Sequence, residues 1–181
     1  SDLTGYKNVI TTDMGGTSFD VGLIWDGEPA FTYVSNVNQY EYFLPKVDIQ
    51  AVGNGGGSLV RVDPTTGSLR VGPDSAGAVP GPVCYDKGGT IPTVTDAALI
   101  LGYISADTFA NGTIKLNREK AVIAIEEIGD KLGLGLMETA AGIVKISEFQ
   151  MADLIRRMTI QKGFDPRDFI LFAFGGAGPM H

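Results

Sequence analysis

Short runs of apolar and β-branched residues dominate the first third of the chain. One run covers residues 8–13 and stops at the glycine pair 15–16, and residues 19–25 then alternate apolar with small or polar side chains. Residues 26–27 are Asp-Gly, a strong signal for a two-residue hairpin turn between strands. The pattern therefore predicts two antiparallel strands joined at the glycine pair, with a further strand over 30–34.

The next segment continues with short strands and contains two glycine-rich loops. Residues 47–52 are a strand candidate that runs into the glycine-rich segment 53–58. A second hairpin is predicted over 59–71, with Asp-Pro-Thr-Thr-Gly at 63–67 supplying its turn. The Gly- and Pro-rich loop 72–92 is too long for a simple connector, so it is either functional or packed as its own layer.

Most of the chain after residue 92 has apolar residues at the spacing of a helix. Thr95 is a candidate cap for a short helix, Asn117 for a second, and the longest helix is predicted over about 137–161 with Gly163 as its stop signal. A continuous apolar run over 169–174 predicts one more, buried strand. The chain is therefore expected to be a mixed α/β protein without internal repeats.

Composition narrows the class of protein. The 181 residues are 44% hydrophobic and 19% charged, as in soluble globular proteins. A net charge of −7 argues against nucleic acid or an anionic membrane as a partner, and no apolar run approaches the ~20 residues of a membrane span. The single cysteine, Cys84, excludes an internal disulfide and fits a reducing cytoplasm. We therefore expect a cytoplasmic protein that binds neither nucleic acid nor membrane.

The first glycine pair lies in a string with phosphate-binding chemistry. The first strand ends at Asp13, the chain turns through Gly15 and Gly16, and Thr17 and Ser18 offer hydroxyls before the second strand begins. Backbone N–H groups of a glycine turn can approach a phosphate because no Cβ is in the way. Asp13 could hold Mg²⁺ directly or through water, which makes it the candidate catalytic residue. A plain hairpin with a glycine turn is the alternative.

A second glycine loop follows the last apolar strand. It reads Gly175, Gly176, Ala177 and Gly178, and Pro179 suits the first turn of a helix. Alone this string is a weak signal. If both turns bind one nucleotide, they must open on the same side of one sheet.

Residues 13–21 closely resemble the second phosphate-binding hairpin of the actin, sugar-kinase and heat-shock-chaperone ATPase superfamily. The resemblance implies a ribonuclease H-like (actin-like ATPase) lobe, a mixed sheet with helices, that binds ATP and Mg²⁺. In the superfamily, a strand that ends in a Gly-Gly turn contacts adenosine and the α-phosphate, and residues 172–181 show the same pattern. The implied nucleotide-binding residues are Gly15, Gly16, Thr17, Ser18, Gly175, Gly176, Ala177 and Gly178.

Further motifs resemble the hydantoinase A/5-oxoprolinase family, which includes subunits of acetone and acetophenone carboxylases. They run from end to end of the chain: residues 13–21, 47–58, 70–73, 75–77, 80–85, 92–97 and 174–181. The resemblance implies an ATP-dependent cyclic-amide hydrolase with a second subunit of hydantoinase B type. An ATP-using subunit of a ketone carboxylase is an alternative. A non-catalytic ATP-binding scaffold is another, although chaperone-like ATPases lack the loop set from Asp48 to Asp96.

Family members also carry an earlier lobe with another Asp-x-Gly-Gly-Thr string. This sequence contains no second copy. We therefore expect residues 1–181 to be the second, C-terminal-type lobe of an actin-like fold, excised from a longer chain. A Gly- and Pro-rich insertion is expected over about 37–92, and the chain alone should bind ATP weakly or not at all.

Metal binding is a separate question. The candidates carry oxygen, nitrogen or sulfur ligand atoms: Asp13, Asp48, Asp96, His181 and Cys84. Relatives commonly place a histidine two residues after the position of Asp48, where this chain has Gln50, a poorer transition-metal ligand. The bland alternatives are a strand-end turn for Asp48, a helix start for Asp96 and a core position for Cys84. For residues 53–58, a substrate-side or structural loop is favoured over a third phosphate contact.

Overall fold

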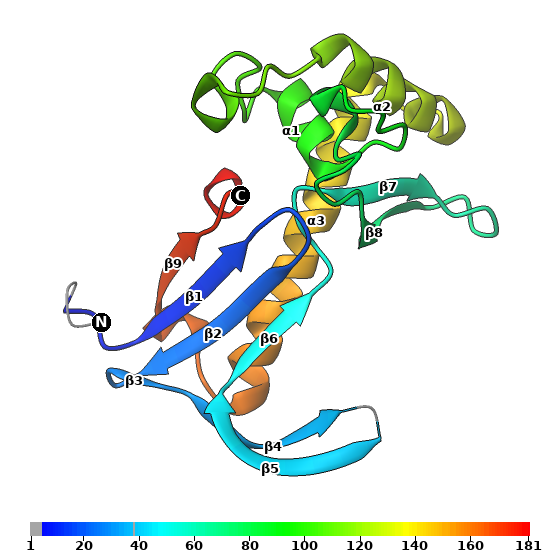
Figure 1. The fold of residues 1–181 in the computed structure, drawn as a ribbon. Helices are drawn as coiled ribbons and strands as arrows, with labels where there is room; N and C mark the ends of the chain where they lie inside the picture. Colours follow the sequence, from blue (N-terminus) through cyan, green and yellow to red (C-terminus); the bar gives the residue numbers. More distant parts are fainter. Residues whose placement is uncertain (1–4, 38) are drawn as a thin grey trace.

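The computed structural model describes residues 5–37 and 39–181, and its centre is a mixed five-stranded sheet (Figure 1). The order is β3-β2-β1-β9, and β6 pairs with β2 beside β3. The strands of this sheet are β1 (Val9–Met14), β2 (Phe19–Trp25), β3 (Glu28–Pro29), β6 (Ile49–Val52) and β9 (Ile170–Phe174). The predicted mixed α/β class is confirmed.

The first two strands form the hairpin that the sequence predicts. β1 and β2 are antiparallel, and Asp13 faces Asp20 across the pair. The next turn has positive φ at both central residues, 50° at Asp26 and 87° at Gly27, as an Asp-Gly hairpin turn requires. β9 pairs with β1 in the parallel direction, which places Phe174 beside Asp13.

One face of this sheet packs on the C-terminal half of the long helix α3 (Leu136–Met158), which runs behind it in Figure 1. Alternate residues of β1 and β2 point to this helix, as the period of two dictates. The buried cluster consists of Ile10, Met14, Phe19, Val21, Leu23, Met151, Leu154, Met158 and Ala177. We call it the sheet cluster.

The N-terminal half of α3 belongs to a second cluster. It packs with α1 (Val94–Leu101), α2 (Arg118–Leu132) and the hairpin of β7 (Ser58–Val62) and β8 (Leu69–Ser75). Its buried residues include Val60, Val71, Cys84, Val94, Leu99, Ile125, Ile128, Ala140, Ile143 and Val144. We call it the helical cluster; α3 passes through both.

A third sheet is the two-stranded ribbon of β4 (Phe31–Val37) and β5 (Tyr40–Val47), which extends below the main sheet in Figure 1. The predicted strand 30–34 is therefore longer, and it pairs with β5 instead of extending the first hairpin. Within the predicted insertion 37–92, β6 joins the main sheet; the insertion itself stays a prediction. Among the residues described, no helix is both long and apolar enough to cross a membrane.

The helix boundaries differ from the predictions at two places. Asn117 caps α2 as expected, its side chain accepting from the N–H of Lys120. The cap of α1 is Thr93 and not Thr95, because Thr93 and Asp96 form a capping box in which each side chain bonds the other's backbone. The long helix ends at Met158, and Gly163 instead closes a 3₁₀ turn over Ile160–Lys162.

The last strand was predicted to be buried, and this is wrong for the chain as described. All five residues of β9 are exposed, with Phe172 at 55% and Leu171 at 54%. The reason is position: β9 is the edge strand of the sheet and has β1 as its one neighbour in the described residues. Pro179 lies in a single 3₁₀ turn, Gly178–Met180, rather than in an α-helix.

Candidate functional site

The two glycine turns that the sequence singles out lie side by side. β1 and β9 are parallel, so their carboxyl ends share one edge of the sheet, and each turn follows directly from one of these strands. The N–H of Ala177 donates to the carbonyl oxygen of Met14 at 2.8 Å, which ties the second turn to the end of β1. The predicted convergence of the two turns on one side of one sheet is confirmed.

Gly175 has no room for a side chain at this junction. Its φ is +83°, a conformation that favours glycine. A methyl group on Gly175 would overlap the carboxylate oxygen of Asp13 and would lie 2.5 Å from the carbonyl oxygen of Met14. The absence of a Cβ therefore lets the second turn pass directly against Asp13.

On their outer side the turns are open. A Cβ built on Gly15, Gly16 or Gly176 would meet nothing within 4 Å. The N–H groups of Gly16 and Thr17 donate to no backbone carbonyl within residues 5–37 and 39–181. Exposed backbone donors without side chains in front of them suit the oxygens of a phosphate group. The edge therefore has the shape and the donors that a phosphate needs.

Two aspartates occupy opposite positions of the hairpin beside this edge. Asp13 and Asp20 are direct cross-strand partners, so their side chains leave the same face of the hairpin. The hydroxyl of Ser18 donates to Oδ2 of Asp20 at 2.7 Å. Like charges in directly opposed positions destabilise a sheet, and a divalent cation with oxygen ligands relieves this repulsion. The donor set fits Mg²⁺.

Asp20 has no role in the sequence-based prediction, although it belongs to the same string as Asp13. The signal that could have found it is its register. In an antiparallel pair, residues equally far from the centre of the turn face each other, and Asp13 and Asp20 are equally far from the turn at 16–17.

Asp96, another metal candidate, is fully buried and already bonded. Its Oδ2 accepts from the N–H and hydroxyl of Thr93 at 2.8 and 2.9 Å and from the N–H of Val83 at 3.2 Å. Its Oδ1 accepts from the N–H of Cys84 at 2.7 Å. Asp96 therefore joins the start of α1 to the turn at Val83–Tyr85, a structural role that leaves little capacity for a ligand.

The remaining metal candidates lie at separate places. Asp48 forms an ion pair with Lys162, and Nδ1 of His181 lies 3.7 Å from a carboxylate oxygen of Glu148. No group of three or more His, Cys, Asp and Glu side chains in the described parts of the chain could hold a metal. The structure thus does not gather Asp13, Asp48, Asp96 and His181 into one site. The predicted role of Asp13 on Mg²⁺ stays a prediction.

Cys84 is a core residue. It is fully buried, and burial raises the pKa of its thiol far above the ordinary value, with the neighbouring charge of Asp96 adding to the rise. A thiol that stays protonated is a poor nucleophile and a poor metal ligand, because both roles require the thiolate.

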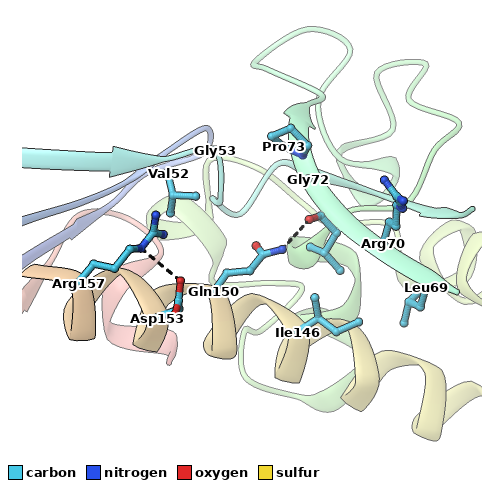
Figure 2. A pocket seen from close by; sticks show the side chains of 11 residues that line it. Val52, Gly53, Leu69, Arg70, Gly72, Pro73, Ile146, Gln150, Asp153 and Arg157 are labelled. Carbon is cyan, nitrogen blue, oxygen red and sulfur yellow. Dashed lines mark hydrogen bonds and ion pairs between the residues drawn. The ribbon is translucent and has the colours of Figure 1, made fainter. Parts of the chain in front are cut away.

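A hollow between β8 and α3 lies apart from the two glycine turns. Figure 2 shows this cavity of about 410 Å³ between β8 and α3, crossed by a hydrogen bond from Nε2 of Gln150 to the carbonyl oxygen of Val71 at 3.0 Å. An ion pair between Arg157 and Asp153, 3.2 Å long, lies at one end. None of the predicted site residues lines it, so it is separate from the two glycine turns.

Comparison with known proteins finds similar sequences along the whole chain. The family model described as hydantoinase/oxoprolinase matches residues 1–181. The chain is 48% identical over 179 residues to the acetophenone carboxylase gamma subunit of Aromatoleum aromaticum, covering 98% of the chain and 24% of that protein. It is 47% identical over 178 residues to the caprolactamase subunit alpha of Pseudomonas jessenii, covering 98% of the chain and 25% of that protein.

Two solved structures are similar throughout. The nucleotide-free structure of acetone carboxylase has a TM-score of 0.92 at 40% identity and covers 99% of this chain and 26% of that one. The ATP-dependent caprolactamase from Pseudomonas jessenii has a TM-score of 0.85 at 46% identity and covers 94% and 25%. The chain thus spans about a quarter of these relatives. Together with the mixed sheet and its helices, the likeness confirms an actin-like ATPase fold.

Proposed function

Because the chain belongs to the hydantoinase/oxoprolinase family, we propose that it supplies the second phosphate loop and the adenosine loop of the ATP site in an ATP-dependent cyclic-amide hydrolase. The observation that carries the proposal is the meeting of turns 15–18 and 175–178 at the ends of two parallel neighbouring strands. The similarity to a caprolactamase, whose name specifies a cyclic amide, supports the substrate class.

Each part of the edge has a role in this proposal. The N–H groups of Gly16 and Thr17 and the hydroxyl of Thr17 hold phosphate oxygens, and Asp13 and Asp20 hold Mg²⁺. Mg²⁺ bound to ATP neutralises the charge that develops as the terminal phosphoryl group moves. Asp13 is the residue on which turnover depends most, because it also borders the second turn at Gly175.

The second turn holds the other end of the nucleotide. Gly175, Gly176, Ala177 and Gly178 bind adenosine and the α-phosphate, and the open space at Gly176 leaves room for them. Transfer of a phosphoryl group to an amide oxygen turns a poor electrophile into a good one, so that water can then open the ring. The chain's contribution is to position the phosphates for this transfer.

A ketone carboxylase is the second candidate. It is favoured by the 48% identity to the acetophenone carboxylase gamma subunit and by the TM-score of 0.92 to acetone carboxylase. The nucleotide edge would act in the same way, with a phosphoryl group transferred to an enol oxygen. The two candidates therefore differ in the substrate and not in the residues described above.

We further propose that residues 1–181 are the second lobe of a longer cytoplasmic polypeptide, which works with a subunit of hydantoinase B type. Its relatives are named as alpha, beta and gamma subunits, which supports an assembly of several chains. A lobe that carries one phosphate loop forms half of an ATP cleft, so full affinity for ATP requires the other lobe.

The test uses the full-length enzyme with its partner subunit. Asp13→Ala should lower ATP turnover at least about 100-fold, because it removes a ligand of the metal that stabilises the transferred phosphoryl group. Asp130→Ala, an exposed carboxylate on α2, is the matched control and should retain wild-type rates. Wild-type ATP hydrolysis in Asp13→Ala would refute the proposed site.

The same preparation separates the two substrates. ATP hydrolysis that hydantoin, 5-oxoproline or a lactam stimulates supports the amide hydrolase. Stimulation by a ketone that depends on bicarbonate supports the carboxylase instead, and stimulation by neither contradicts both.

A further inference from the structure

The glycine-rich segment 53–58 lies against turn 15–18, which we call the phosphate turn, on the side of its carbonyl oxygens. The N–H of Gly56 donates to the carbonyl oxygen of Gly15 at 3.0 Å, and the N–H of Gly57 donates to the carbonyl oxygen of Gly16 at 2.7 Å. Both carbonyl groups of the glycine pair are therefore held by one backbone segment. We call residues 55–57 the support segment.

These bonds determine where the phosphate donors point. A peptide group is planar and trans, so its C=O and N–H point in opposite directions. The carbonyl of Gly15 shares a peptide plane with the N–H of Gly16, and the carbonyl of Gly16 shares one with the N–H of Thr17. Holding the two carbonyl groups inward thus directs the N–H groups of Gly16 and Thr17 outward.

The close approach requires glycine in the support segment. A Cβ on Gly55 would lie 2.5 Å from the backbone nitrogen of Thr17, and a Cβ on Gly57 would lie 2.7 Å from the carbonyl oxygen of Gly16. Real Cβ atoms do not approach backbone this closely, so any side chain here would push the phosphate turn outward.

Two hydroxyl groups hold this arrangement in place. The buried hydroxyl of Thr95 and the N–H of the same residue both donate to the carbonyl oxygen of Gly56 at 2.8 Å. The hydroxyl of Ser75 donates to the carbonyl oxygen of Gly16 at 3.3 Å. Thr95 belongs to α1 and Ser75 to β8, so both anchors belong to elements of the helical cluster rather than to the main sheet.

The support segment is also joined to α3. The side chains of Asn54 and Ser147 are both fully buried. Nδ2 of Asn54 donates to the carbonyl oxygen of Ser147 at 2.8 Å, and the hydroxyl of Ser147 donates back to Oδ1 of Asn54 at 2.8 Å. The segment therefore cannot shift without breaking buried hydrogen bonds.

We propose that Thr95 and Ser75 are positioning residues for the nucleotide: through Gly56 and Gly16 they orient the N–H groups that hold the phosphates. The inference rests on the proposed function. It extends the ATP site from the sheet edge to α1 and β8, which contribute no direct nucleotide contact in the proposal. Thr95 bonds the carbonyl oxygen of Gly56, and the N–H of Gly56 in turn bonds the carbonyl oxygen of Gly15. Ser75 bonds the carbonyl oxygen of Gly16 directly.

The experiment measures kcat/KM for ATP in the full-length enzyme with its partner subunit. Thr95→Val keeps the shape of the side chain and the backbone bond to Gly56 but removes the hydroxyl. We expect kcat/KM for ATP to fall about five-fold, the effect of one lost hydrogen bond, and Ser75→Ala to act similarly. Thr95→Ser keeps the hydroxyl and should stay within about two-fold of wild type on the same basis.

Thr139→Val is the control for simple destabilisation. Thr139 is fully buried, and its hydroxyl donates to the carbonyl oxygen of Gly135 at 2.9 Å, at the start of α3. It should lower the melting temperature about as much as Thr95→Val while kcat/KM for ATP stays at the wild-type value. An equal loss of kcat/KM in Thr139→Val would overturn the positioning role, as would equal impairment of Thr95→Ser and Thr95→Val.

Failure of this inference can be told from failure of the proposed function. If Asp13→Ala abolishes ATP turnover while Thr95→Val and Ser75→Ala keep wild-type kinetics, the site stands and the positioning role falls. If Asp13→Ala turns over ATP at the wild-type rate, both fall.

Discussion

Gly175 is the residue at which the two turns leave the least space. Replacing it by alanine combines a left-handed backbone conformation with an overlap on the carboxylate of Asp13. We expect Gly175→Ala to reduce ATP affinity of the full-length enzyme at least about ten-fold and to lower the free energy of unfolding by about 1–3 kcal/mol. Calorimetry and urea denaturation measure the two effects.

Gly142 supplies the matched control. It lies in α3, and a methyl group there would meet only a methyl carbon of Leu69, at 3.7 Å. Gly142→Ala should be neutral or stabilise the helix by up to ~1 kcal/mol. If Gly175→Ala behaved like Gly142→Ala, the close junction between the turns would be disproved.

The thiol of Cys84 allows a second test at the level of one side chain. Because burial and the charge of Asp96 raise its pKa, almost no thiolate exists at pH 8 in the folded chain. A disulfide reagent should therefore leave the native protein unmodified for hours and modify it within seconds in 6 M guanidinium. Rapid modification of the native protein would show that Cys84 is accessible.

Among the elements, α1 depends on one buried carboxylate. In Asp96→Asn the amide keeps one oxygen acceptor, so its NH₂ group must face an N–H that the carboxylate now accepts from, that of Cys84 or Thr93. A buried donor left without an acceptor costs about 1–3 kcal/mol, and urea denaturation should show at least this loss. Asp130→Asn, exposed on α2, should change stability by less than about 0.5 kcal/mol. An equally small effect of Asp96→Asn would refute the anchoring role.

Comparing elements with their predictions shows which information is local. The hairpin at Asp26-Gly27 and the Asn117 cap were predictable because the residues that form them are neighbours in sequence. The cap of α1 was also local, since Thr93 forms its capping box with Asp96 three residues on, and assigning it to Thr95 missed that signal. The bond from the hydroxyl of Thr95 to Gly56, 39 residues away, could not be predicted from neighbouring residues. The convergence of the two turns followed from a family resemblance, whereas the pairing of Asp13 with Asp20 required the strand register.

At the scale of the whole molecule, α3 connects the sheet cluster with the helical cluster. Leu154 belongs to the first and Ile143 to the second, and both are almost fully buried. Leu154→Ala and Ile143→Ala should each lower the free energy of unfolding by about 2–5 kcal/mol. Since one continuous helix carries both residues, we expect each to shift a single common unfolding transition.

Two probes can separate the clusters. The one tryptophan, Trp25, packs against Phe164 and Phe169 beside the sheet cluster, with ring centroids 5.0 and 5.4 Å away. Its fluorescence follows the sheet, while far-ultraviolet circular dichroism follows mainly the helices. If Ile143→Ala shifted the dichroism midpoint and left the fluorescence midpoint in place, the two clusters would unfold independently. Ile123→Ala, which alters an exposed side chain on α2, is the control.

The parallel pairing of β1 with β9 also determines when the two glycine turns can meet during synthesis of the chain. Thr12 and Phe172 are 160 positions apart, so a chain emerging from the ribosome cannot bring the turns together until nearly all of the segment between them has been synthesised. Closing so long a loop is among the slower events in folding. A nucleotide that binds here would therefore select finished molecules and shift the balance away from incompletely folded ones.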